Sequence, residues 1–112
     1  SAVSAPIYHV VNIMTKFGET NHFQASDFIS TIEGFTGRTI SGAIVNTRRP
    51  DDRLLSLYRK QKAEFVDVGY PDTGCQLFLE DLLETSGDVI RHDPEKLAGL
   101  IERIIAGIPF PA

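Results

Sequence analysis

The run from Thr39 to Asn46 most constrains what this chain can fold into. It is composed of small and apolar residues on both of the faces that a strand presents. Strands covered on both faces are typical of parallel sheets, because the crossover helices pack above and below them. Three further runs have the length and composition of strands: Tyr8 to Met14, Ala63 to Val68 and Cys75 to Glu80. The pattern therefore predicts an α/β fold with a mostly parallel sheet.

Helical patterns lie between and after these strands. The first is expected to be capped by Ser26 or a neighbour, and to end at the glycines Gly34 and Gly37. A second helix is expected to start at Pro50, with acidic residues in its first turn and basic residues in its last. The apolar face predicted for the first helix consists of Phe28, Ile29, Ile32 and Phe35.

The last helix has the strongest local signals. Asp93 is expected to be its N-cap and Pro94 its first residue, and an apolar stripe at helical spacing continues to Ala106. Residues 107–112 are expected to form a tail, because two prolines prevent further helix. The predicted order is βαβαββ followed by this helix, so residues 1–112 are expected to form a single α/β domain.

Composition narrows the classes of function. The net charge is -4 and the basic residues are scattered, which argues against nucleic acid as a partner. The cluster Arg59-Lys60-Gln61-Lys62 is interpreted as complementing a helix dipole. No apolar run approaches the roughly 20 residues of a membrane span, and no signal peptide is visible. With a single cysteine, Cys75, the chain is expected to be a soluble cytoplasmic protein.

Parallel strands bring their carboxyl ends to one edge of a sheet, where α/β proteins bind ligands. We therefore expect three polar segments to share this rim: Thr15 to Thr20, Asn46 to Arg49, and Arg91 to Asp93. The first follows a strand and offers hydroxyls, a carboxylate and a glycine, which suits a binding loop. An ordinary strand-to-helix connection, whose polar groups satisfy its own backbone, explains the same residues equally well from position alone.

Arg91 and the start of the last helix offer a cation beside free backbone N–H groups, a combination that binds phosphate. The alternative is a surface arginine beside a cap carboxylate that occupies the same N–H groups. The chain contains no Gly-rich phosphate-binding motif of its own. No metal site is predicted, because His9, His22 and His92 have no ligand-like spacing.

Two segments resemble the family of 2-phospho-L-lactate transferase (CofD-like) and the YvcK-type gluconeogenesis factors. The first is Asn12 to Thr20 with the following Ala25-Ser26-Asp27, and the second is Ile90 to Leu97. The likeness covers nearly all of residues 7–106. Lys16 and Phe17 depart from the Gln-Pro that is usual in the loop. The resemblance implies a Rossmann-like, three-layer fold. It also implies that the chain is the carboxy-terminal portion of a larger CofD-like domain.

The resemblance implies two functions. The first is a UDP-sugar-binding regulatory protein, concerned with cell shape and cell-wall metabolism during gluconeogenic growth, and the R-H-D-P ending looks more like this branch. The second is transfer of a phospholactyl group from a guanosine diphosphate donor to a deazaflavin. A divalent metal is then expected in the full-length protein, with no cofactor and no activity in the fragment alone. Carried over by matching positions, the residues lining the ligand crevice would be Asn12, Thr15, Gly18, Glu19, Thr20, Asn46 and Arg91.

A third hypothesis needs no ligand. Missing neighbouring strands would leave a sheet edge that invites pairing, so an inactive α/β module that assembles as a homodimer is also consistent with the sequence.

Overall fold

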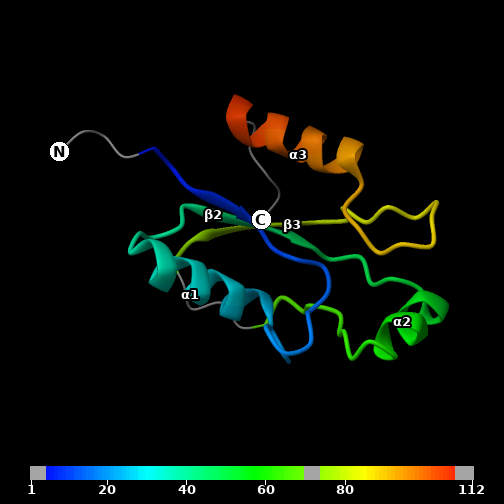
Figure 1. Ribbon diagram of the computed structural model, residues 1–112. Helices are drawn as coiled ribbons and strands as arrows, with labels where there is room; N and C mark the ends of the chain where they lie inside the picture. The colour runs from blue at the N-terminus through cyan, green and yellow to red at the C-terminus, as the bar shows by residue number, and fades with distance from the viewer. Residues whose placement is uncertain (1–4, 70–73, 108–112) are drawn as a thin grey trace.

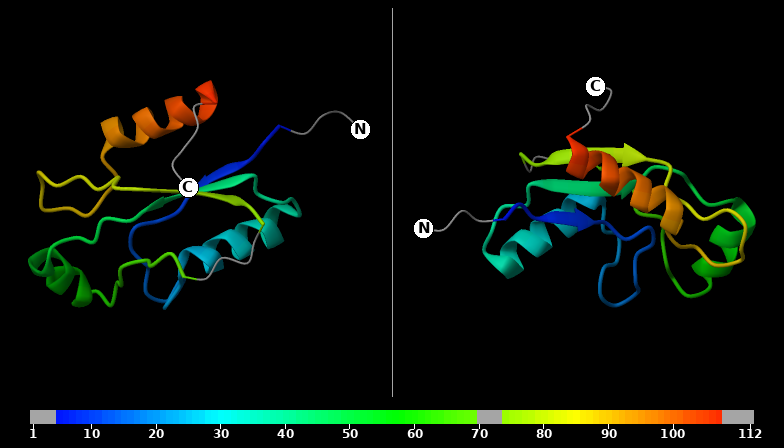
Figure 2. Two further views of the ribbon diagram at one scale, coloured as in Figure 1. Left: turned by 180° about the vertical axis from the view of Figure 1, so that it is seen from behind. Right: turned by 90° about the horizontal axis from the view of Figure 1, so that it is seen from above.

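The computed structural model describes residues 5–69 and 74–107. In this part of the chain one sheet contains β1 (Tyr8–Val10), β2 (Gly42–Asn46) and β3 (Gln76–Glu80) in the order β1-β2-β3. Both pairs of neighbouring strands are parallel. The three arrows point the same way in the right-hand view of Figure 2, so the carboxyl ends of the strands share one edge, as the sequence predicts.

Two helices cover opposite faces of this sheet, α1 (Ala25–Thr36) and α3 (Pro94–Ala106), as Figure 1 shows. All five residues of β2, the central strand, are buried. Ala43 and Val45 belong to the core beneath α1, whereas Ile44 lies in a second core with Leu100 of α3. This alternation confirms that the chain has an α/β fold of three layers with a parallel sheet.

The caps explain where these two helices begin and end. Asp93 accepts hydrogen bonds from the first turn of α3, and Gly107 ends that helix in the left-handed conformation, so the predicted bounds are confirmed. Residues 108–112 of the predicted tail lie outside the described residues. The N-cap of α1 is Gln24 rather than Ser26, and its backbone N–H is bound by the Asp27 carboxylate. Gly37 ends α1.

Phe35 and Gly34 correct the prediction for α1. The side chain of Phe35 is 89% exposed, so it lies outside the buried face that Phe28 and Ile29 form. Gly34 lies inside the helix and does not end it. Phe35 occupies the last turn of α1.

The helix α2 (Asp52–Arg59) begins two residues after Pro50, the expected start. Asp51 is its N-cap, and the carboxylate accepts a hydrogen bond of 2.9 Å from the Leu54 N–H. Leu54 and Leu55 are buried. Figure 2 shows α2 beyond the carboxyl ends of the strands, so it stands at the predicted ligand edge.

Two strand predictions were wrong in extent. The first strand leaves the sheet after Val10, and the segment expected as a third strand, 63–68, pairs with that outgoing chain instead of with the sheet. Met14 and Phe65 form an isolated antiparallel bridge, and the Val66 N–H donates to the Ile13 carbonyl at 2.8 Å. Val66 is buried in the core beneath α1. Segment 63–68 is apolar like a strand because part of it packs in the core beneath α1. At Val66 its backbone hydrogen bond goes to the chain leaving β1 and not to a strand of the sheet.

Candidate functional site

One cavity at the carboxyl edge lies between the chain leaving β1 and the segment that enters α3. We call it the Arg91 cavity. Its volume is about 390 Å³, and the lining residues are Val10, Asn12, Ile13, Met14, Tyr58, Ile90, Arg91 and His92. The structure therefore brings together two of the residues expected to bind ligand, Asn12 from the first strand's loop and Arg91 from the α3 entry. They come from segments about 80 positions apart in the sequence, which parallel topology joins at this edge.

Arg91 is available to a ligand. Its side chain is 65% exposed, and its nearest carboxylate, that of Glu84, lies 3.9 Å away. Glu84 is itself bound by the backbone N–H and hydroxyl of Ser86. These hydrogen bonds lower the pKa of Glu84, with a smaller contribution from the Arg91 charge. The long separation and the Ser86 contacts leave the guanidinium donors of Arg91 free to bind a phosphate bidentately.

The start of α3 does not bind an anion through its backbone. The Asp93 carboxylate accepts hydrogen bonds from the Glu95 N–H at 2.9 Å and from the Lys96 N–H at 3.2 Å. Pro94 has no N–H to offer. The cap therefore occupies the donors of the first turn, and Arg91 is the group of this segment that can bind phosphate.

Thr15 and Asn46 are buried, and their polar groups bind the chain itself. Thr15 is 4% exposed, and its hydroxyl accepts a hydrogen bond of 2.8 Å from the Glu64 N–H. Asn46 is 3% exposed. Its oxygen accepts from the backbone of Arg48 and Leu82, while its amide donates to the Arg48 carbonyl. Neither side chain lines the Arg91 cavity.

The remaining predicted site residues form an exposed turn. Gly18 has a φ of 87°, and its N–H donates to the Asn21 side chain at 2.6 Å. The Thr20 hydroxyl accepts from the Lys16 N–H at 2.7 Å. Glu19 forms an ion pair with Lys16 at 2.9 Å, which raises the pKa of that lysine. The structure brings these three residues together with one another, outside the wall of the Arg91 cavity.

Among the wall residues that were not predicted to bind ligand, Tyr58 and His92 carry hydrogen-bonding side chains, and His92 belongs to the predicted rim segment Arg91 to Asp93. The Tyr58 hydroxyl accepts a hydrogen bond of 2.9 Å from the Ile90 N–H, which ties α2 to the α3 entry. Burial lowers the pKa of His92, and a hydrogen bond to the Val11 backbone offsets part of that shift. Its Nε2 is buried without a hydrogen-bond partner among the described residues. The position of His92 next to Arg91 in the sequence indicated that it could lie at the same site. No sequence pattern indicated this for Tyr58, because helix periodicity assigns Tyr58 to a packed face.

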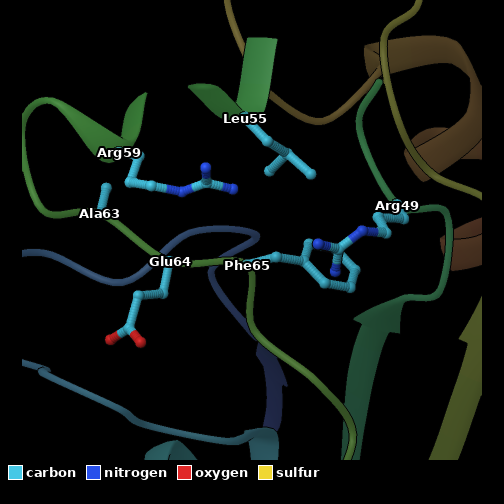
Figure 3. A pocket seen from close by; sticks show the side chains of 6 residues that line it. All are labelled: Arg49, Leu55, Arg59, Ala63, Glu64 and Phe65. Atoms are coloured by element: carbon cyan, nitrogen blue, oxygen red, sulfur yellow. The ribbon is translucent and has the colours of Figure 1, made fainter. Parts of the chain in front are cut away.

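A second cavity of about 350 Å³ lies beside α2, and we call it the Arg49–Arg59 cavity (Figure 3). The sequence pattern assigned Arg59 to the helix dipole and placed Arg49 in the polar rim segment Asn46 to Arg49, without joining the two. Only the fold shows that both arginines face the same space. Its lining residues are Arg49, Leu55, Arg59, Ala63, Glu64 and Phe65.

Over residues 5–69 and 74–107, no three His, Cys, Asp or Glu side chains gather where they could hold a metal ion. No helix in the same part of the chain is both long and apolar enough to cross a membrane.

Comparison with known proteins finds the same fold in longer chains. A crystal structure of a UPF0052 family protein from Bacillus halodurans superposes with a TM-score of 0.82 at 28% identity, and the match covers 90% of this chain and 34% of that one. A protein of Aquifex aeolicus, provisionally named a gluconeogenesis factor, is 43% identical over 100 residues, which are 86% of this chain and 30% of the relative.

The gluconeogenesis factor of Listeria monocytogenes is 29% identical over 97% of this chain and 33% of its own length. The chain thus spans about a third of the length of these relatives. The sequence profile of the family described as 2-phospho-L-lactate transferase CofD matches residues 1–83. The two relatives from Aquifex aeolicus and Listeria monocytogenes carry the name gluconeogenesis factor. By the match to the family profile, the chain belongs to the CofD family.

Proposed function

We propose that this chain forms one wall of a nucleotide-sugar site in a regulatory protein of the gluconeogenesis-factor type, with a UDP-sugar as ligand. The observation that carries the proposal is the position of Arg91 and Asn12 on one cavity at the carboxyl edge of a parallel sheet. The cell-wall and cell-shape role expected from the resemblance is part of the same proposal. The names of the relatives support the regulatory branch.

The chemistry of the Arg91 cavity suits such a ligand. The exposed guanidinium of Arg91 can bind a diphosphate with two donors. The Asn12 amide offers both a donor and an acceptor, the groups needed for sugar hydroxyls. Ile13 and Ile90 supply apolar surface beside them. A volume of about 390 Å³ encloses part of a nucleotide sugar, and the rest of the longer protein would supply the remaining contacts.

The proposal is tested by titrating the full-length protein with a UDP-sugar in a calorimeter. Arg91→Ala is expected to weaken binding roughly tenfold to a hundredfold, because it removes charge-assisted hydrogen bonds. The matched control is Arg38→Ala. Arg38 precedes β2 at the opposite end of the sheet, where its guanidinium donates to the Ala5 carbonyl at 2.7 Å. No saturable binding by the unmodified protein, or equal losses in the two variants, would refute the proposal.

The name of the matching family favours a second candidate, phospholactyl transfer to a deazaflavin acceptor. This reaction predicts a phosphodiester product when the full-length protein receives a donor in which a diphosphate joins lactate to guanosine, together with a deazaflavin alcohol and a divalent metal. The acceptor hydroxyl bonds to the phosphorus that carries lactate, the P–O–P bond of the donor breaks, and GMP is released. Chromatography of the acceptor separates product from substrate. An inactive protein that still binds UDP-sugars would exclude the transferase and leave the regulatory function.

A further inference from the structure

We propose that the Arg49–Arg59 cavity is a second anion site, which takes the phosphate group of a small phosphorylated molecule. Its volume of about 350 Å³ is in the range of small-molecule pockets. Figure 3 shows the side chains of Arg49 and Arg59 entering the cavity from different segments, with their guanidinium groups toward its middle. Two guanidinium groups that converge on one space are the arrangement that binds phosphate oxygens by paired hydrogen bonds.

In the part of the chain that the structure describes, no carboxylate forms an ion pair with either arginine. Glu64 is the acidic residue in the cavity wall, and Figure 3 shows its carboxylate directed away from both arginines. His22 holds it there, because the backbone N–H and the Nδ1 of His22 each lie 3.0 Å from a Glu64 oxygen. The cavity therefore has a net positive charge although the chain is acidic overall.

Contacts within the chain hold the Arg49 side of the cavity wall in place. The guanidinium of Arg49 lies over the Phe65 ring, 5.6 Å from its centre, a distance at which cation and ring attract each other. The Met14 bridge and the hydrogen bond from the Thr15 N–H to the Glu64 carbonyl, at 2.7 Å, hold the backbone around Phe65. The buried side chain of Leu55 forms an apolar wall. Such preorganisation lowers the entropic cost of ordering the arginine on binding.

This site is separate from the Arg91 cavity. The two cavities share no lining residue. Met14 belongs to the wall of one and Phe65 to the wall of the other, so the Met14–Phe65 bridge lies between them. The second site therefore does not rest on the proposed nucleotide-sugar function, and it can be tested by itself.

Pyrophosphate is the probe, titrated into the full-length protein in a calorimeter. Arg49→Gln and Arg59→Gln are each expected to weaken its binding roughly tenfold to a hundredfold. Arg59→Lys retains the charge but not the planar fork, so a smaller loss is expected. Lys60→Gln is the matched control, because it removes the same charge from the next position and Lys60 lines neither cavity. Arg91→Ala is expected to leave a pyrophosphate site of unchanged affinity.

Several results would overturn the second site. The first is the absence of saturable pyrophosphate binding, and the second is a loss of pyrophosphate affinity in Lys60→Gln as large as in the cavity variants. The third is the loss of all pyrophosphate binding in Arg91→Ala while Arg49→Gln and Arg59→Gln bind pyrophosphate as the unmodified protein does. A thermal melt of each variant without pyrophosphate checks folding. If Arg49→Gln fails to fold, the comparison of Arg59→Gln with Lys60→Gln decides the question. Failure of UDP-sugar binding, with pyrophosphate binding still dependent on Arg59, would refute the nucleotide-sugar function and retain this site.

Discussion

Replacing Thr15 with valine separates the two roles that sequence reasoning left open for this residue. Valine has nearly the shape of threonine but no hydroxyl. The substitution removes the acceptor for the Glu64 N–H, which the Thr15 hydroxyl binds at 2.8 Å. The backbone hydrogen bond between the same two residues, from the Thr15 N–H to the Glu64 carbonyl, remains. The change therefore isolates one hydrogen bond at a site that is 4% exposed.

An unpaired backbone donor that stays out of reach of water costs about 1–3 kcal/mol. Glu64 itself is partly exposed, because its side chain retains 45% of its accessible surface. Water can therefore reach part of this region, and the lower half of the range applies. We expect Thr15→Val to lower the free energy of unfolding by about 1–2 kcal/mol. Thr15→Ser keeps the acceptor and is expected to lose less.

Urea denaturation of the full-length protein measures this effect. The midpoint is expected to fall while the slope stays the same, since the surface exposed on unfolding is unchanged. UDP-sugar affinity of the folded variant, measured well below the midpoint, is expected to stay within about twofold of the unmodified protein, a difference under 0.5 kcal/mol. Unchanged stability with a large loss of affinity would show that the Thr15 hydroxyl contacts ligand, and would refute the structural interpretation.

Three other perturbations test the packing and the charges. Gly42→Ala places a Cβ 2.8 Å from two aromatic rings and is expected to destabilise by about 1–3 kcal/mol. Gly34→Ala, with open space around its Cβ inside α1, is expected to stabilise by up to about 1 kcal/mol in the same urea titration. Phe35→Ser, at a side chain that is 89% exposed, is expected to change stability by less than about 0.5 kcal/mol. Burial lowers the pKa values of His9 and His92 below the ordinary 6.5, so the unfolded chain binds more protons than the folded chain at acidic pH. The free energy of unfolding is therefore expected to be highest above pH 6.5 and to fall as the pH drops through the lowered pKa values. Replacing both histidines with Gln is expected to make the urea midpoint depend less on pH.

Local signals predicted the elements that depend on local structure. The bounds of α3 follow from an N-cap, a proline at the first position and a glycine at the end, all of which act within a few residues of one another. The buried centre of the sheet follows from the apolar composition of β2 on both faces. These features need no knowledge of distant contacts.

The predictions that were wrong or incomplete concern features that depend on contacts between residues far apart in the sequence. The segment 63–68 has the pattern of a strand, but its pattern cannot say whether it pairs with the sheet or with the chain that leaves β1. Phe35 has helical spacing with the buried residues of α1, and the spacing alone cannot show that its side chain is 89% exposed in the folded chain. The Arg49–Arg59 cavity was missed for the same reason, because arginines from different segments meet only after α2 has docked.

Polarity and position at a strand end do not separate residues whose polar groups bind the chain itself from the arginines that we propose as binding groups. Thr15 and Asn46 have the expected polarity, yet their hydrogen bonds hold the chain leaving β1 and the turn after β2 in place. These same bonds fix the backbone around Arg49. Arg49 comes directly after the turn that the Asn46 side chain holds, and the Phe65 ring beneath its guanidinium comes directly after the Thr15–Glu64 contact in the sequence. The buried polar residues thus position the backbone that carries the proposed binding groups and are not expected to contact the ligand themselves. Variants at Thr15 and Asn46 should accordingly change stability first and affinity only through the loss of a rigid platform, whereas variants at Arg49, Arg59 and Arg91 should change affinity directly.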